Sequence, residues 1–288
     1  MKKVLIFFII IFRISVSQEN IRIISLSHFS TRILIELEQE KKIAAQGWNN
    51  NIEFPEDIEE KLKDIPDISV GVPTKEKIYQ YAPTHIIGWE SAFTDKNIGS
   101  KEELKNNGIK IFSFESASTN GTIEILFDDL RKLGKLLLIE NKIEEEIRKI
   151  SENLKKFEYP NKGENILFIS NVDKNPSLIG GNGLIQSISE KAGYRNVFGD
   201  INKNYFTADW ENIIEKDIDN IIILAIDEKD FKNKYNKLLN KGYFNDKKAF
   251  SKNNIFYLNY IETAPSLHIA ETAEKIALKK LYRVEKNK

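Results

Sequence analysis

The sequence predicts an α/β fold of two lobes, each built on a parallel sheet, with one long helix joining the lobes. Apolar segments rich in β-branched residues recur along the chain and alternate with stretches of helical period. These segments are residues 21–26, 85–89, 109–114, 165–169, 220–226 and 254–258. Continuous apolarity is typical of strands that are buried on both faces, and alternation of strands with helices indicates parallel sheets.

The middle of the chain divides these segments into two groups. Apolar residues step by three and four positions over residues 123–137 and again over residues 143–157, so both stretches are predicted to be helical. Proline and glycine in residues 159–165 end the second pattern. We therefore predict two Rossmann-like lobes with a ligand cleft between them. The N-terminal lobe spans residues 18–138, the interlobe helix and linker 139–162, and the C-terminal lobe 163–288.

The first residues have the pattern of a secretory signal. Lys2 and Lys3 precede an apolar stretch over residues 4–12, and small residues stand at Ser15 and Ser17. This pattern predicts a signal peptide over residues 1–17 that is cleaved near Ser17. The apolar stretch is shorter than the roughly 20 residues that span a bilayer, although an uncleaved anchor is the alternative. We expect export to a periplasm-like compartment.

Composition excludes several kinds of function. The chain contains no cysteine, so disulfides, a catalytic thiolate and the lipid-anchored form of export are excluded. Its 43 Lys and Arg residues are balanced by 43 Asp and Glu residues, which gives no indication of nucleic-acid binding. A hydrophobic content of 41% is sufficient for real cores in one large domain or two domains of ordinary size.

Residues that follow the predicted strands are the candidates for a binding site, because ligands of open α/β sheets bind beyond the carboxyl ends of the strands. Those that we select are Ser27, His28, Phe29, Trp48, Trp89, Glu90, Asn182, Tyr260 and Glu262; Asn171, Asp227 and Glu228 also follow strands. The tryptophans and the histidine favour a flat or aromatic ligand. In the alternative interpretation, the tryptophans only cover the core.

The histidines allow more than one interpretation. His28 lies between a predicted strand and a predicted helix, where Ser27 or Ser30 could cap the helix and leave the imidazole facing water. His268, near the start of the last helix, either faces the cleft from the second lobe or lies on the helix surface. With His85 placed before its strand, three dispersed histidines make a poor closed zinc site.

No catalytic motif stands out. Adjacent residues such as Ser27 and His28 cannot provide the geometry of a catalytic triad. The glycine-rich stretch at residues 179–183 lacks the lysine and hydroxyl residue of a phosphate-binding loop, and no GxSxG sequence occurs. An exported enzyme is kept only as the alternative from a different functional class.

Several longer segments stand in a characteristic order. They are IISLSHFSTRILIELEQEKKIAAQGWNN (residues 23–50), TKEKIYQYAPTHIIGWES (74–91), GIKIFSFES (108–116), IGGNGLIQSISEKAGYRNVF (179–198) and FTADWENIIEKDIDNIIIL (206–224). Together they resemble the substrate-binding proteins of ABC importers for iron-siderophore complexes, haem and cobalamin, over nearly all of the chain after the signal. Pro83–Thr84 departs from the Pro-Asp that is usual in that family.

The resemblance implies a non-catalytic receptor without a resident cofactor. We expect it to act as a monomer, to close by a small motion about a stiff helix, and to deliver a small metal chelate to the transmembrane dimer of an ABC permease. A surface glutamate on each lobe docks to the permease in this family, and the matching positions are Glu76 and Glu211.

The resemblance leaves the identity of the chelate open. The strand ends carry no arginine, which argues against anionic catecholate siderophores, and the final loop lacks the Pro-Arg that is frequent in the family. Aromatic walls with an imidazole favour haem, ahead of a ferric siderophore, with His28 as a metal ligand through the bound chelate. Cobalamin is the alternative ligand.

Overall fold

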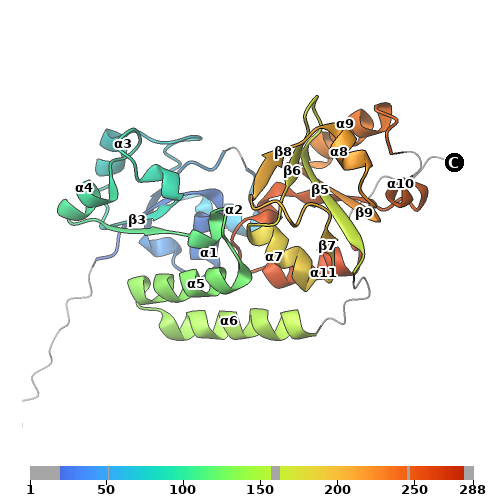
Figure 1. Ribbon diagram of the computed structural model, residues 1–288. Helices are drawn as coiled ribbons and strands as arrows, with labels where there is room; N and C mark the ends of the chain where they lie inside the picture. Colours follow the sequence, from blue (N-terminus) through green and yellow to red (C-terminus); the bar gives the residue numbers. More distant parts are fainter. Residues whose placement is uncertain (1–19, 51, 157–162, 245–246, 282–288) are drawn as a thin grey trace, which may run out of the picture.

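The computed structural model describes residues 20–50, 52–156, 163–244 and 247–281. The predicted signal peptide, residues 1–17, lies outside the described residues. Within these ranges no helix is both long enough and apolar enough to cross a membrane. Figure 1 shows two lobes side by side, with two helices running along one side beneath them.

The N-terminal lobe is built on a four-stranded parallel sheet in the order β2-β1-β3-β4. Its strands are β1 (Ile23–Leu26), β2 (Ile43–Gln46), β3 (His85–Gly88) and β4 (Lys110–Ser113). Its helices are α1 (His28–Glu36), α2 (Glu56–Leu62), α3 (Lys75–Tyr79) and α4 (Lys101–Asn106), with short 3₁₀ turns at Glu40–Lys42, Glu90–Ala92 and Glu115–Ala117. Hydroxyl side chains at Ser27, Thr74 and Ser100 cap the first, third and fourth helices by accepting backbone N–H groups.

The C-terminal lobe is built on a mixed sheet in the order β10-β9-β5-β6-β8, with β7 paired to β5. Its strands are β5 (Asn165–Asn171), β6 (Ser177–Ile179), β7 (Arg195–Asn196), β8 (Tyr205–Thr207), β9 (Asn220–Ala225) and β10 (Ile255–Asn259). Its helices are α7 (Leu184–Lys191), α8 (Trp210–Ile214), α9 (Glu228–Asn240), α10 (Lys248–Ser251) and α11 (Ile269–Ala277), and a 3₁₀ turn covers Tyr260–Thr263.

The predicted two-lobed α/β fold is confirmed, with one difference in the second sheet. The expectation of parallel pairing holds for β10, β9, β5 and β7. Strands β6 and β8 pair antiparallel to their neighbours. The chain turns back after β5 within the short segment 172–176, which leaves no room for the crossover helix that a parallel partner requires.

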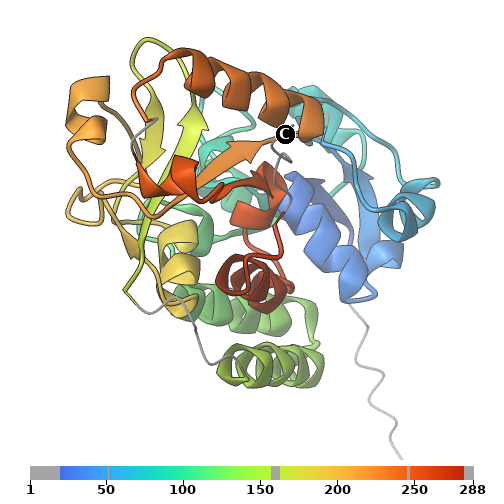
Figure 2. The same cartoon turned by 90° about the vertical axis from the view of Figure 1, so that its right-hand side faces the viewer.

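One long helix, α6 (Glu140–Lys155), joins the lobes and packs antiparallel to the last helix of the N-terminal lobe, α5 (Ile123–Leu137). Helix α5 ends at Leu138, whose left-handed backbone (φ 60°) reverses the chain into α6. Helix α6 packs against α5 and also against α11 of the second lobe. Figure 2, turned by 90°, shows this helix at the outer edge of the molecule beneath the same neighbours.

A single apolar core runs through the junction of the lobes. One buried cluster contains Phe29 of α1, Leu133 of α5, Ile147 of α6, Ile188 of α7 and Ile276 of α11. Because removal of such apolar surface from water contributes roughly 25 cal/mol per Å², separating the lobes at this end would be costly. The junction between the lobes is therefore a packed joint.

Candidate ligand-binding cleft

The turn from β1 into α1 is held by four completely buried hydroxyl groups. Ser27 Oγ and Ser25 Oγ each lie within hydrogen-bond distance of Ser30 Oγ (2.6 and 2.8 Å), and Thr31 Oγ1 donates to Ser25 Oγ at 2.8 Å. Ser27 also accepts the backbone N–H of Ser30, which confirms that it caps the helix. These hydroxyl groups satisfy one another, so the turn is fixed without help from the side chain at position 28.

His28 is the first residue of α1 and is 92% buried. The expectation that its imidazole could simply face water is therefore wrong. Neither Nδ1 nor Nε2 has a hydrogen-bond partner. Burial, with a smaller contribution from the positive charge of Arg32, lowers the pKa of His28 from 6.5 to about 4. The imidazole is thus neutral near pH 7 and keeps a lone pair for a hydrogen bond or a metal.

The predicted aromatic residues of the first lobe lie together around this imidazole. The ring of Phe29 meets those of His28 and Trp89 edge to face, with centroids 5.5 and 4.7 Å away, and Trp48 lies 6.5 Å from Trp89. Both tryptophans are half-buried. The indole Nε1 of Trp89 is buried without a hydrogen-bond partner. The carboxyl ends of β1, β2 and β3 therefore present an aromatic wall with unpaired polar atoms.

A cavity of about 1130 Å³ opens between the two lobes. Of the residues selected from the sequence, Tyr260 lines it, and so do Asn171, Asp227 and Glu228 at the strand ends of the second lobe. Tyr260 stacks on Tyr205 of β8, with ring centroids 6.3 Å apart. This volume is slightly above the roughly 300–1,000 Å³ of typical small-molecule sites, so the cavity has room for a large ligand.

Sequence reasoning missed the residues of the first lobe that line the large cavity. The segment after β2 brings Ile52, Glu53, Phe54 and Pro55 to the same cavity. Ile226 of the second lobe also lines it and is 64% exposed. Ile226 could have been selected from the sequence because it directly follows a strand of buried isoleucines. Residues 50–55 have no pattern that would mark them as cavity residues.

A second, smaller cavity lies beside the large one and is lined by His28. Its volume of about 10 Å³ corresponds to roughly one water molecule. It is lined by His28, Phe29 and Arg32, and it shares with the large cavity the residues Ile52, Glu53, Phe54, Pro55 and Ile261. The buried imidazole thus lies in a cavity that shares five lining residues with the interlobe space, and we call the two cavities together the interlobe cleft.

His268 bridges the lobes and is absent from the residues that line the two cavities. Its Nε2 lies 2.9 Å from the carboxylate of Glu36 in α1, and its Nδ1 contacts Glu271. The hydrogen bond to Glu36 raises the pKa of His268, outweighing burial. Burial alone would raise the pKa of Glu36, but the hydrogen bond from His268 and the charge of Arg32 bring it below its usual value. The side chain of His268 is 40% exposed, so it keeps a surface position while it ties α11 to α1 of the first lobe.

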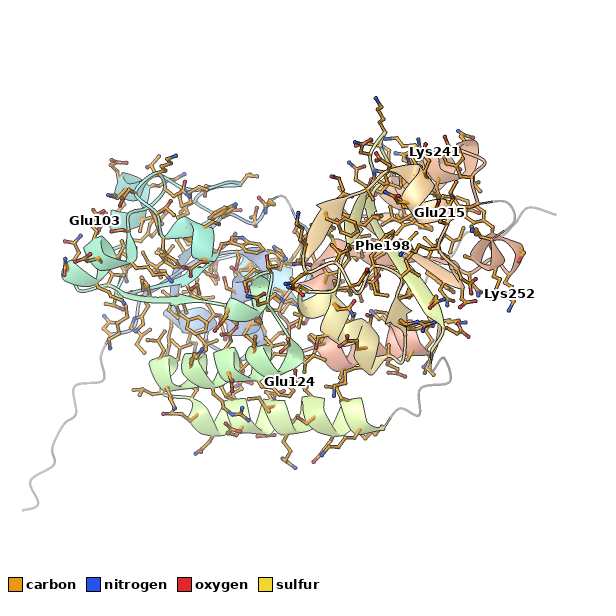
Figure 3. The ribbon with its side chains drawn as sticks, in the orientation of Figure 1. Glu103, Glu124, Phe198, Glu215, Lys241 and Lys252 are labelled. Carbon is orange, nitrogen blue, oxygen red and sulfur yellow. The ribbon has the colours of Figure 1, made fainter. Side chains whose placement is uncertain are left out.

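Trp48, Trp89 and the other predicted site residues are absent from the residues that line the interlobe cleft. Glu90 pairs with Lys101, and Glu262 pairs with Lys275 while capping its own 3₁₀ turn. Asn182 lines a separate side groove of about 620 Å³ between the start of α5 and α7. Glu124, labelled in Figure 3, lines the same groove.

The two glutamates that the resemblance assigns to permease docking lie one on each lobe. Glu76 is in the first turn of α3 and Glu211 in the first turn of α8, and both are exposed. Glu215, labelled in Figure 3, follows Glu211 at the end of the same short helix.

The charged and polar groups of the cleft are not arranged as a metal site of the protein itself. Among the described residues, no group of three or more His, Asp or Glu side chains could hold a metal ion. His28 offers a single neutral nitrogen donor, and a metal held there would need its remaining ligands from elsewhere.

Comparisons with known proteins agree with this architecture. The model of the periplasmic binding protein family matches residues 23–260. No curated protein sequence matches the chain. Among solved structures, a periplasmic binding protein from Veillonella parvula has a TM-score of 0.83 at 20% identity, covering 91% of this chain and 92% of its own.

Two further structures illustrate the range of neighbours. The periplasmic haem-binding protein of Vibrio cholerae has a TM-score of 0.75 at 16% identity and covers 91% of this chain and 99% of its own. An ABC-type Fe³⁺-hydroxamate transport protein from Saccharomonospora viridis has a TM-score of 0.70 at 17% identity, with 88% and 91% covered. At these identities the likeness establishes the shared fold.

Proposed function

Because the chain belongs to the periplasmic binding protein family, we propose that it is the exported substrate-binding component of an ABC importer. It captures an iron chelate between its lobes and delivers it to a membrane permease. Haem and ferric siderophores are the candidate chelates, and cobalamin is the alternative. The family is one of binding proteins and not of enzymes, in agreement with the lack of a catalytic motif.

One observation carries the proposal. The interlobe cleft ends at a neutral, buried imidazole without a partner, beside the aromatic wall of Phe29, Trp48 and Trp89. A buried polar group without a hydrogen bond costs on the order of 1–3 kcal/mol, and a bound chelate can recover this by accepting coordination or a hydrogen bond from His28. Aromatic side chains provide the large apolar contact that such ligands require.

Ligand binding is tested by titrating the purified mature protein with haem, ferric siderophores and cobalamin while recording absorbance and tryptophan fluorescence. We expect a dissociation constant below about 10 μM, or roughly −7 kcal/mol, with quenching that comes from Trp48 and Trp89. Trp210 is the matched control because it packs in the second lobe against Tyr243 and Phe244.

The control variants separate these contributions. Quenching should be lost in the Trp48→Phe, Trp89→Phe double variant and retained in Trp210→Phe. Failure of every chelate to bind in this range would contradict the proposed function. A haem absorbance shift that persists in His28→Ala would remove His28 as metal ligand and leave the receptor function intact.

Docking to the permease rests on Glu76 and Glu211, which present one carboxylate on each lobe. Such pairs with arginines of a partner govern orientation and encounter rate more than affinity. Charge reversal by Glu76→Lys and Glu211→Lys should leave ligand affinity unchanged and weaken stimulation of the reconstituted permease ATPase. Glu215→Lys, on the same helix as Glu211, is the control. Equal effects of all three variants would contradict the assignment.

A further inference from the structure

The cations beside the interlobe cleft are already bound within the protein. Lys234 Nζ donates to the backbone carbonyl of Leu224 at 2.9 Å and pairs with the carboxylate of Asp230 at 2.8 Å. Arg32 Nε pairs with Glu36 at 2.7 Å. Both cationic side chains are largely buried. Neither is therefore free to neutralise an anionic ligand without breaking an existing pair.

The acidic side chains of the cleft are arranged differently. Glu53 from the first lobe and Asp227 and Glu228 from the second lobe line the large cavity and are exposed. Glu228 pairs with Lys232, one turn along α9, at 2.5 Å. The carboxylate of Asp227 caps the same helix by accepting a backbone N–H at 2.7 Å. The ion pairs found among the described residues include neither Glu53 nor Asp227.

From these contacts we propose that the cleft selects a neutral or cationic metal chelate, with a positively charged group held between Glu53 and Asp227, and that it rejects polyanionic chelates. This inference rests on the proposed function and names its substrate class. The two carboxylates come from different lobes, so closure around an anion would bring like charges together, whereas a cation would be attracted by both. His28, in the smaller cavity beside this space, adds no positive charge that could offset an anion.

The inference reverses the order of ligands favoured by the sequence. Haem carries two propionates, which would have to lie against an acidic wall or remain in water. A neutral or cationic siderophore, or a corrinoid, meets no such cost. The aromatic wall suits either class, so charge decides between them.

The test uses one ferric chelate in three forms that differ in net charge. A linear ferric trihydroxamate with a terminal ammonium group is compared with its N-acetylated neutral form and its N-succinylated anionic form. Affinities come from fluorescence quenching at low salt. We expect the acetylated form to bind about tenfold more weakly than the ammonium form and the succinylated form about a hundredfold more weakly. Higher ionic strength should reduce the affinity ratios among the three forms.

Variants assign the effect to the two carboxylates. The Glu53→Gln, Asp227→Asn double variant keeps a good helix cap, since asparagine caps as well as aspartate, and it should reduce the three affinities to within about threefold of one another. Glu124→Gln, in the side groove, is the control and should leave the ranking unchanged. A ranking that survives in the double variant would overturn the assignment.

The remaining ligands separate the two proposals. Haem, a ferric triscatecholate, cyanocobalamin and aquocobalamin are titrated in parallel. Tightest binding by a neutral or cationic chelate supports the inference. Tightest binding by haem, the triscatecholate or the succinylated trihydroxamate overturns the inference and leaves the proposed function standing. Absence of binding by every chelate contradicts the proposed function itself.

Discussion

Burial of His28 predicts a specific pH dependence of stability. Its pKa falls from 6.5 to about 4 in the folded protein because the imidazole is removed from water. The unfolded chain therefore takes up a proton at this residue as the pH falls below 6.5, whereas the folded chain does so only near pH 4. The stability associated with the neutral imidazole is fully present above 6.5 and is lost as the pH falls toward about 4.

The size of the effect follows from the same pKa values. One pKa unit corresponds to about 1.4 kcal/mol, so the fall from 6.5 to about 4 corresponds to about 3 kcal/mol. As the pH falls from about 7.5 to about 4.5, the free energy of unfolding of the wild type should fall by about 2.5 kcal/mol relative to that of the His28→Phe variant. Any cost of packing the new ring is independent of pH and cancels from this shift.

Urea denaturation at five or six pH values, followed by tryptophan fluorescence, measures these differences. Histidine NMR provides an independent readout, since the chain has three histidines. The His28 signals should not titrate near pH 6.5. A stability difference that stays within about 0.5 kcal/mol over the whole range, or a His28 signal with an ordinary midpoint, would refute the burial of this imidazole.

The interlobe bridge, a buried turn and a helix cap give further predictions. Substituting His268→Gln should lower the free energy of unfolding chiefly below pH 6.5, where the histidine is protonated. This loss should diminish as rising pH passes the raised pKa of His268, and also as falling pH protonates its partner Glu36. Urea denaturation at a series of pH values measures both decreases. Gly121→Ala would place Cβ 2.0 Å from the backbone carbonyl oxygen of Ser116 and should lower the melting temperature markedly. Gly71→Ala, whose Cβ meets nothing within 4 Å, should not. Equal melting temperatures of the two variants would contradict the close contact at Gly121. Thr122→Ala removes the cap of α5 and should cost about 1 kcal/mol in denaturant unfolding, against no measurable loss for the exposed Thr119→Ala.

The architecture was largely predictable because its signals are local. Buried strands, helical spacing and hydroxyl caps such as Ser27 are visible in neighbouring residues, and the division of the chain at the helices near residue 138 follows from the same patterns. Strands β6 and β8 were missed because three-residue strands carry too little pattern to recognise. Their antiparallel pairing depends on contacts with β5, which local sequence does not encode.

The cleft was predictable only where it coincides with strand ends. Tyr260 was found by that rule, whereas Glu53 and Phe54 reach the cleft on a segment of irregular structure. The same rule selected Trp48 and Trp89, which lie next to His28 and Phe29 but are absent from the residues that line the two cavities. The bridge between His268 and Glu36 joins residues separated by 232 positions. A contact of that kind arises from the packing of α11 against the rest of the molecule, and the sequence offers no periodicity that would reveal it.

The hydroxyl cluster at the β1–α1 turn has a consequence for how the receptor could change its ligand. Ser25, Ser27, Ser30 and Thr31 satisfy one another's hydrogen bonds, while the ring of His28 contributes none. The backbone at this point does not depend on which residue occupies position 28. A substitution at position 28 can therefore change the chemistry of the smaller cavity without removing any hydrogen bond of the hydroxyl cluster, so that ligand preference and the stability of this turn can vary separately in evolution.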